Sequence, residues 1–230
     1  MKKNTNSDFI DFSESLGGTV RALFSLASSG DMKNEEARAA FIRQHFQQAK
    51  FVCAEQVHKT NIGFVDFQTA LPVPETDALI TNDKNVVMGV FTADCIPVYF
   101  NDAITGYAGI VHAGWRGVSS NIIISALENI RKNYPIDLTS IKIVIGPGIC
   151  TKHFEFSAEV VHMFPEIFVK KKKGKYFADL KKIIKTQLID SGVKSKNIYD
   201  SRICSFEEKN IFSHRRDVTA ARNCAFLKIL

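Results

Sequence analysis

Hydrophobic positions along the chain recur at two spacings, one typical of helices and one typical of strands. Residues 35–48 carry apolar side chains at helical spacing, whereas residues 86–100 are nearly all apolar, as expected of a strand buried on both faces. The same reading predicts further helices at 119–134, 157–164 and 177–191, and further strands at 50–57, 63–67, 106–112, 141–145 and 198–203.

These elements predict the fold class α/β (mixed α+β), a single domain with layered mixed β-sheets flanked by helices. We find no internal repeat and no linker rich in Pro, Gly or Ser. We therefore expect one domain over residues 18–230, long enough to bury a substantial core, preceded by a flexible, polar N-terminal segment at residues 1–17.

The amino-acid composition indicates the cellular compartment in which we expect the protein. The chain is 45% hydrophobic and 23% charged, which is ordinary for a soluble globular protein. Its five cysteines are odd in number and form no Cys-x-x-Cys pair, which favours a reducing compartment over a disulfide framework. The first fifteen residues lack the apolar region of a signal peptide, and no apolar run reaches membrane-spanning length. We expect a cytoplasmic protein.

The formal net charge of +6 suits an anionic or phosphate-bearing substrate. Much of the excess lies in the lysine-rich run at residues 170–175. No aromatic residues interleave these lysines, so a solvated loop is favoured over a nucleic-acid-binding arm.

Three short runs carry metal-capable side chains. His112 opens the run His-Ala-Gly-Trp-Arg-Gly at an expected strand-to-helix junction; Cys95 lies in Thr-Ala-Asp-Cys, and His58 ends Gln-Val-His. A His/Cys/His set suits zinc, and copper is also possible. The gaps between the three residues are too long for a zinc-finger pattern, and each residue taken singly could be a core or capping side chain.

Asp94 interrupts the apolar run at 86–100. Burying a carboxylate without partners costs several kcal/mol, on the order of what a small domain can lose before it unfolds. We therefore expect Asp94 to have a fixed hydrogen-bonding partner.

Two further groups of residues could bind ligands. Arg215 and Arg216 can hold phosphate or carboxylate in two places, unless they form a surface cluster in which Asp217 neutralises one of them. Cys150 and His153 follow a Gly-Pro-Gly turn and could be extra metal ligands, although a packed loop is the simpler interpretation.

Several of these runs occur together, in this order, in one family. The sequence resembles the laccase-domain family, labelled multicopper polyphenol oxidase and now understood as purine nucleoside phosphorylases with adenosine deaminase activity. The resemblance covers about residues 50 to 222 and rests on these runs: Gln56–His58, Asp77–Thr81, Thr92–Val98, His112–Gly117, Gly146–Ile149 and Phe212–Asp217.

The resemblance implies a metal, usually zinc, bound by His58, Cys95 and His112. It also implies phosphorolysis of adenosine, inosine and methylthioadenosine to the base and a pentose 1-phosphate, and hydrolytic deamination of adenosine. A metal at this position can activate water for attack on C6 of adenine. The expected partners are a purine nucleoside and phosphate, with no nucleic acid or membrane, and the expected assembly is a monomer or weak homodimer.

Roles for the neighbouring residues follow from their positions in the sequence and from their chemistry. Asp94 and Glu155 are the candidate proton shuttles, and Glu155 also counts among the candidate substrate-binding residues. Arg116, Arg215 and Arg216 are the candidates for phosphate binding, because Arg grips phosphate with a planar fork.

The sequence departs from the family pattern in three places. Residues 24–30 lack the Arg of the usual Thr-x-Arg-x-Gly-Gly run, Ala220-Ala221-Arg222 replaces Thr-Gly-Arg, and Cys204-Ser205 replaces Cys-Thr. These departures bear on substrate range more than on the metal ligands.

Other functions remain open from the sequence. Cys95 could be the nucleophile of a metal-free hydrolase with His112 or His58 as base, acting for instance on a cell-wall precursor amide. A copper-dependent polyphenol oxidase would need several copper sites and many histidines, and the chain has six. A non-catalytic binding module would have an occluded site.

Overall fold

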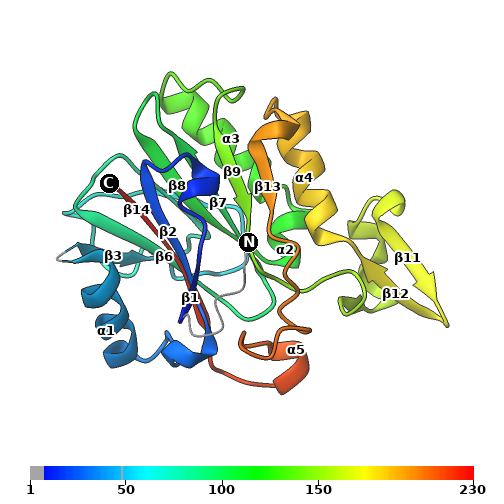
Figure 1. Ribbon diagram of the computed structural model, residues 1–230. Coiled ribbons are helices and arrows are strands. Elements are labelled where there is room, and N and C mark those ends of the chain that lie inside the picture. The colour runs from blue at the N-terminus through cyan, green and yellow to red at the C-terminus, as the bar shows by residue number, and fades with distance from the viewer. Residues whose placement is uncertain (1–7, 48) are drawn as a thin grey trace.

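The computed structural model describes residues 8–47 and 49–230, which fold into two large sheets, one small sheet and the helices around them (Figure 1). The first sheet has the order β1-β2-β14-β6-β3, and the second has the order β13-β9-β7-β8-β5-β4. The strands of the first sheet are β1 (Phe9–Asp11), β2 (Val20–Ser25), β14 (Asn223–Ile229), β6 (Val86–Thr92) and β3 (Lys50–Cys53). Those of the second are β13 (Ile198–Asp200), β9 (Lys142–Ile145), β7 (Ile96–Asp102), β8 (Tyr107–Ala113), β5 (Ala78–Thr81) and β4 (Ile62–Phe64).

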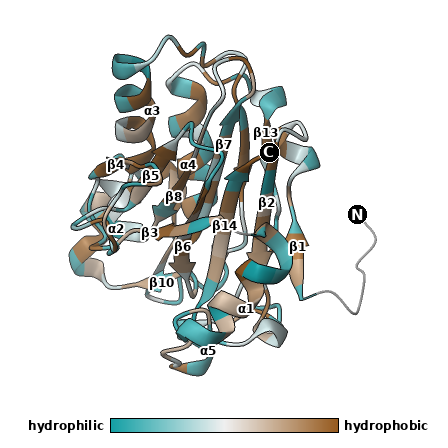
Figure 2. Cartoon of the chain, turned by 90° about the vertical axis from the view of Figure 1, so that its left-hand side faces the viewer, coloured by the Kyte–Doolittle hydropathy of each residue, from teal (hydrophilic) through white to brown (hydrophobic). Residues whose placement is uncertain are grey.

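The two large sheets pack face to face and helices cover their outer faces, which gives four layers. Helix α1 (Glu35–Phe46) packs on the outer face of the first sheet. Helices α3 (Ile122–Asn133) and α4 (Leu180–Asp190) pack on the outer face of the second. Figure 2 shows the apolar residues gathered on the strands between these layers. The predicted fold class, with layered mixed sheets flanked by helices, is confirmed.

Side-chain alternation along each strand explains the layers. Along β7, Val98 and Phe100 face the helices, while Tyr99 between them faces the first sheet. Along β14, Leu227 faces the second sheet and Phe226 faces α1. Because a strand presents successive side chains to opposite faces, a strand covered on both sides must be apolar throughout.

The apolar run at 86–100 is two strands and not one, so the prediction of a single strand is wrong. Strand β6 belongs to the first sheet and β7 to the second, and only residues 93–95 connect them. Both strands are covered on both faces and are therefore apolar throughout. The sequence pattern consequently does not show where the first strand ends and the second begins. Asp94 lies in this crossover with φ of 90°.

Other predicted elements are confirmed in kind but shifted or divided. The helix predicted at 119–134 is α3, which begins only at Ile122. A separate short helix, α2 (Trp115–Ser119), precedes it, and Asn121 between the two is left-handed with φ of 64°. Residues 158–163 form a 3-10 helix. The segment predicted as a helix at 177–191 begins as strand β12 (Lys175–Ala178) and becomes α4 only after Asp179, whose side chain caps it.

Two surface predictions are corrected. Residues 9–17 are not a flexible segment, because β1 pairs with β2 and the side chains of Phe12 and Leu16 are buried; residues 1–7 lie outside the described part. The lysine run is not a loop, because β11 (Val169–Lys172) and β12 form a hairpin that projects from the body beside β10 (Glu155–Phe156) (Figure 1).

Among the described residues, no helix is long and apolar enough to cross a membrane.

Candidate metal centre

Three segments that are far apart in the sequence bring His58, Cys95 and His112 together. His58 lies in the loop after β3, Cys95 ends the β6–β7 crossover, and His112 lies near the end of β8. Their nitrogen and sulfur ligand atoms all lie within 4.8 Å of one another. The two imidazole rings lie 4.8 Å apart between centroids and meet edge to face at 82°. We call these three residues the His–Cys–His centre.

Asp77 organises the centre from behind. Its side chain has no exposed surface and comes directly before β5. One carboxylate oxygen accepts from the backbone N–H of His58 at 3.0 Å and lies 2.8 Å from Nδ1 of His112. The other accepts from the N–H groups of Val57 and Lys59 at 3.1 and 2.9 Å. A carboxylate at Nδ1 orients the ring and leaves Nε2 of a neutral His112 free for a metal.

The charges within the centre favour a thiolate. Burial by itself raises the pKa of the Cys95 thiol, but the neighbouring His112 and His58 outweigh it and lower this pKa from 9.0 to about 6. Burial likewise lowers the pKa of His112, but Cys95 and Asp77 raise it from 6.5 to about 9. Both shifts favour a deprotonated Cys95 beside a protonated His112, and a thiolate can serve as a metal ligand or a nucleophile.

The loops that carry the centre adopt unusual backbone conformations. His58 and Gln56 both have φ of 60°, which is uncommon for residues other than glycine. The side chain of Gln56 compensates by bonding both backbone groups of Phe91, accepting from its N–H at 2.7 Å and donating to its C=O at 2.8 Å. Left-handed residues held in place by specific bonds are typical of functional sites.

Asp94 has the fixed partners that its position in an apolar run demanded, so that prediction is confirmed. Its carboxylate accepts from the hydroxyls of Ser205 and Ser213 at 2.6 and 2.7 Å and from the backbone N–H of Arg215 at 2.7 Å. These bonds hold the crossover, and hence Cys95, against the C-terminal loops. The carboxylate is thus engaged in positioning.

Arg116 and Glu155 lie in different settings. The Arg116 side chain is exposed, and its guanidinium lies 4.3 Å from the centre of the Trp115 ring. The Glu155 carboxylate is also partly exposed and pairs with Lys175 at 2.9 Å on the neighbouring strand.

The two adjacent arginines are used to hold loops. Arg215 donates to the backbone oxygens of His153 and Glu155 at 2.8 and 2.9 Å. Arg216 makes a 2.7 Å ion pair with Asp217 and bonds further main-chain oxygens, those of Ser205, Phe206, Glu208 and Ile211. With its guanidinium committed to the protein, Arg216 does not fit the expected role in phosphate binding, and the alternative of an Arg216–Asp217 pair is the one found.

Sequence reasoning gave no role to Asp77 or Gln56, although both lie in the runs that carry the family resemblance. A signal for Asp77 existed, since a carboxylate directly before an apolar strand needs partners once it is buried. Its partners are backbone groups and a histidine far along the chain, which no local pattern identifies.

A four-layer α/β domain in which one cysteine and two histidines bring their ligand atoms together defines a class of candidate metalloenzymes. The chain belongs to the family described as multi-copper polyphenol oxidoreductase laccase, whose model matches residues 24–229. The predicted resemblance is thereby confirmed.

Relatives at about one-third identity bear the names of enzymes. The purine nucleoside phosphorylase YlmD of Geobacillus stearothermophilus is 34% identical over 202 residues, which cover 79% of this chain and 73% of that protein. The adenosine deaminase RL5, from an unknown prokaryotic organism, is 33% identical over 183 residues, or 72% and 69% of the two chains. The prediction that the protein is an enzyme is confirmed by these relatives.

Solved structures share the fold over nearly the whole length. The crystal structure of Geobacillus stearothermophilus YlmD superposes with a TM-score of 0.89 at 26% identity and covers 97% of each chain. That of a Bacillus licheniformis hypothetical protein, YfiH, gives a TM-score of 0.90 at 23% identity and covers 99% of this chain and 98% of the other.

Proposed function

We propose that this protein is a zinc-dependent purine nucleoside phosphorylase that also deaminates adenosine. The observation that carries the proposal is the convergence of His58, Cys95 and His112 in front of the buried Asp77. The names of the relatives supply the substrate class, a purine nucleoside, with phosphate as the second substrate of phosphorolysis.

The donor set fits zinc. Two imidazoles and one thiolate are ligands that zinc prefers, and three protein ligands leave a fourth position for a substrate or water. Copper accepts the same ligands, so the donors alone do not select the metal. A bound Zn²⁺ supplies Lewis acidity and makes water easier to deprotonate at neutral pH, which is the chemistry that deamination requires.

Residues of the chain itself hold the three donors in place around the open fourth coordination position. Asp77 fixes the tautomer of His112, and its bonds to three successive backbone N–H groups fix the loop that carries His58. Asp94 fixes the crossover that carries Cys95. A site held on all sides in this way does not have to reorganise when the substrate reacts.

Phosphorolysis needs an anion-binding group as well. In this reaction a phosphate oxygen forms a bond to C1′ of the ribose, the C1′–N9 bond breaks, and the base leaves with the electron pair and takes up a proton. Arg116 is the arginine we assign to the phosphate, because its guanidinium is exposed and stacked on Trp115 at 4.3 Å, which limits its orientation.

The test is a nucleoside panel with and without phosphate, with the products separated by chromatography. Adenosine, inosine and methylthioadenosine should give the free base only when phosphate is present, and adenosine should give inosine without phosphate. Cys95→Ala is the inactive comparison, and Cys53→Ser, which removes a thiol in β3, is the matched control. Failure to convert any nucleoside under either condition would refute the proposal.

One observation favours a second candidate, a hydrolase with Cys95 as nucleophile. The lowered pKa of Cys95, to about 6, and the adjacent His112 resemble the activated thiol of such enzymes. Full activity of metal-stripped protein in a strong chelator, abolished by alkylation of Cys95, would favour the hydrolase over the metalloenzyme. Muropeptide precursors are the substrates to add to the panel in that case.

All five cysteines are free thiols, which supports placing the enzyme in a reducing compartment such as the cytoplasm.

A further inference from the structure

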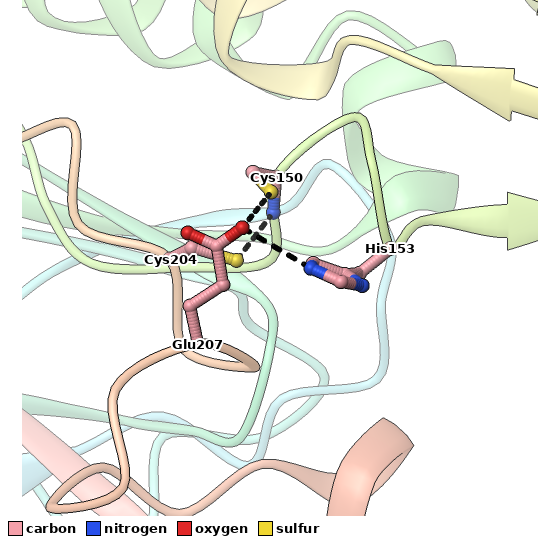
Figure 3. Close-up of side chains that lie close together, drawn as sticks. All are labelled: Cys150, His153, Cys204 and Glu207. Atoms are coloured by element: carbon pink, nitrogen blue, oxygen red, sulfur yellow. Dashed lines mark hydrogen bonds and ion pairs between the residues drawn. The ribbon is translucent and has the colours of Figure 1, made fainter.

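A second group of ligand side chains lies outside the His–Cys–His centre, where two loops meet. Figure 3 shows Cys150, His153, Cys204 and Glu207 turned toward one another. Two sulfurs, an imidazole nitrogen and a carboxylate oxygen all lie within 4.8 Å of one another. Cys204 is buried, Cys150 and His153 are half-buried, and Glu207 is exposed. We call these residues the four-donor cluster.

The same local turn builds each half of the cluster. The N–H of His153 donates to the carbonyl of Cys150 at 3.0 Å, and the N–H of Glu207 donates to the carbonyl of Cys204 at 3.1 Å. Each turn places a thiol and the third residue after it on the same side of the chain. Structural zinc sites commonly combine two short pairs of ligands from separate loops, and here Glu207 supplies a carboxylate oxygen where a Cys or His is usual.

Backbone pairing holds the two turns in register. Gly148 and Cys204 form an isolated parallel bridge, in which Gly148 donates to Ile203 at 3.2 Å and accepts from Ser205 at 3.1 Å. A side chain at Gly148 would collide with Ile96, since its Cβ would lie 2.5 Å from that residue's Cγ1. The cluster is therefore formed by the fold and does not depend on a ligand to bring its loops together.

The surroundings of the donors also suit a metal. The backbone N–H of Cys150 points at the sulfur of Cys204 at 3.3 Å, and N–H donors to sulfur stabilise thiolate ligands. A carboxylate oxygen of Glu207 lies 3.2 Å from Nε2 of His153 and 3.9 Å from the sulfur of Cys150. Lys152, 3.4 Å from the same carboxylate, would balance part of the negative charge that two thiolates and a carboxylate bring.

We propose that the four-donor cluster binds a second Zn²⁺, separate from any metal at the His–Cys–His centre. Four protein donors complete a tetrahedron and leave no position for substrate, so this ion is structural. Soft sulfur and borderline nitrogen ligands exclude Mg²⁺ and Ca²⁺, which take oxygen ligands.

The position of the cluster indicates that the second ion would stabilise the loops around Asp94. Both loops contact Asp94: the N–H of Ile149 donates to its carbonyl at 2.9 Å, and the hydroxyl of Ser205 donates to its carboxylate at 2.6 Å. Asp94 directly precedes Cys95. A metal in the cluster would fix the two loops that fix the crossover, and thereby stabilise the placement of Cys95.

The test is the zinc content of full-length protein purified with reductant and without oxygen, by elemental analysis. Wild type should hold two equivalents, Cys95→Ala one, and Cys95→Ala combined with Cys150→Ser none. Cys53→Ser, the thiol control, should keep both. Glu207→Gln changes an exposed residue and should weaken binding of one equivalent without unfolding the protein.

Cobalt gives an independent readout that does not rely on the Cys150 variant being folded. Co²⁺ added to metal-free Cys95→Ala should produce an intense thiolate-to-metal charge-transfer band from two sulfurs at one equivalent. No such band in this folded variant would overturn the proposal, and so would a Cys150–Cys204 disulfide found in its place. If the centre instead binds no metal, Cys95→Ala will not change the metal count, while the equivalent that depends on Cys150 remains.

Discussion

The His–Cys–His centre takes one side chain from each of three distant segments, whereas the four-donor cluster takes two from each of two short turns. The centre relies on left-handed residues and on the buried Asp77, and it offers three donors. The cluster has ordinary turns and offers four. Three donors leave room for chemistry and four do not, which is why we propose a reactive role for the centre and a stabilising role for the cluster.

The largest effect that would test this comparison is that of Cys95→Ala. We expect turnover of every nucleoside to fall to background, because the variant loses either a metal ligand or the nucleophile. The half-buried side chain leaves only a small void, which costs about 1 kcal/mol of unfolding free energy. Steady-state assays and a thermal melt measure the two effects. A folded variant with wild-type turnover would make Cys95 a packing residue.

The second prediction concerns Asp77→Asn. An amide keeps the shape but can accept fewer N–H groups and does not stabilise a neighbouring imidazolium. We expect the affinity of the centre for zinc to fall by about 10- to 100-fold, as is usual for partners of a ligating histidine. Competition with a chromophoric chelator measures the affinity. The equivalent bound by the four-donor cluster should be unchanged, and equal weakening of both would contradict the assignment.

The third prediction separates substrate binding from metal binding. Arg116→Lys keeps the charge but loses the planar fork, so the apparent KM for phosphate should rise several-fold. Deamination consumes water and not phosphate, and its rate should change little. Zinc content should stay at the wild-type value. Equal losses in both reactions, with unchanged dependence on phosphate, would show that Arg116 only packs on Trp115.

The smallest expected effect is that of Gly114→Ala. A Cβ at this position would lie 2.9 Å from Cδ2 of His58 and 3.3 Å from the sulfur of Cys95, so His58, which is exposed, must move by a fraction of an ångström. We expect a modest loss of kcat and an unchanged melting temperature. A variant with wild-type kinetics would show that the centre tolerates more displacement than its bonding suggests.

Much of the architecture could be predicted from hydrophobic spacing, because strands covered on both faces must be apolar and helices must be amphipathic. The crossover at residues 93–95 could not, since an apolar run looks the same whether its two halves share a sheet or divide between two. The lysine hairpin was missed for the converse reason. Its strands are largely exposed, so no apolar pattern marks them.

The candidate site was predicted from motifs and not from spacing. His58, Cys95 and His112 are brought together by sheet topology, which the linear sequence does not state. The four-donor cluster is the opposite case, because its Cys-x-x-His and Cys-x-x-Glu pairs are each visible in the sequence. That the two pairs lie side by side, joined by the bridge between Gly148 and Cys204, is visible only in the fold.

The crossover at residues 93–95 also has a thermodynamic consequence. It places Cys95 where the chain passes from one large sheet to the other, while His58 follows a strand of the first sheet and His112 lies near the end of a strand of the second. Separating the sheets would therefore pull the three donors apart. An ion that binds only the assembled donors adds RT ln(1 + [L]/Kd) to the stability of the domain, about 4 kcal/mol at a thousandfold excess over Kd. The concentration of the free ion and the stability of the fold are then linked.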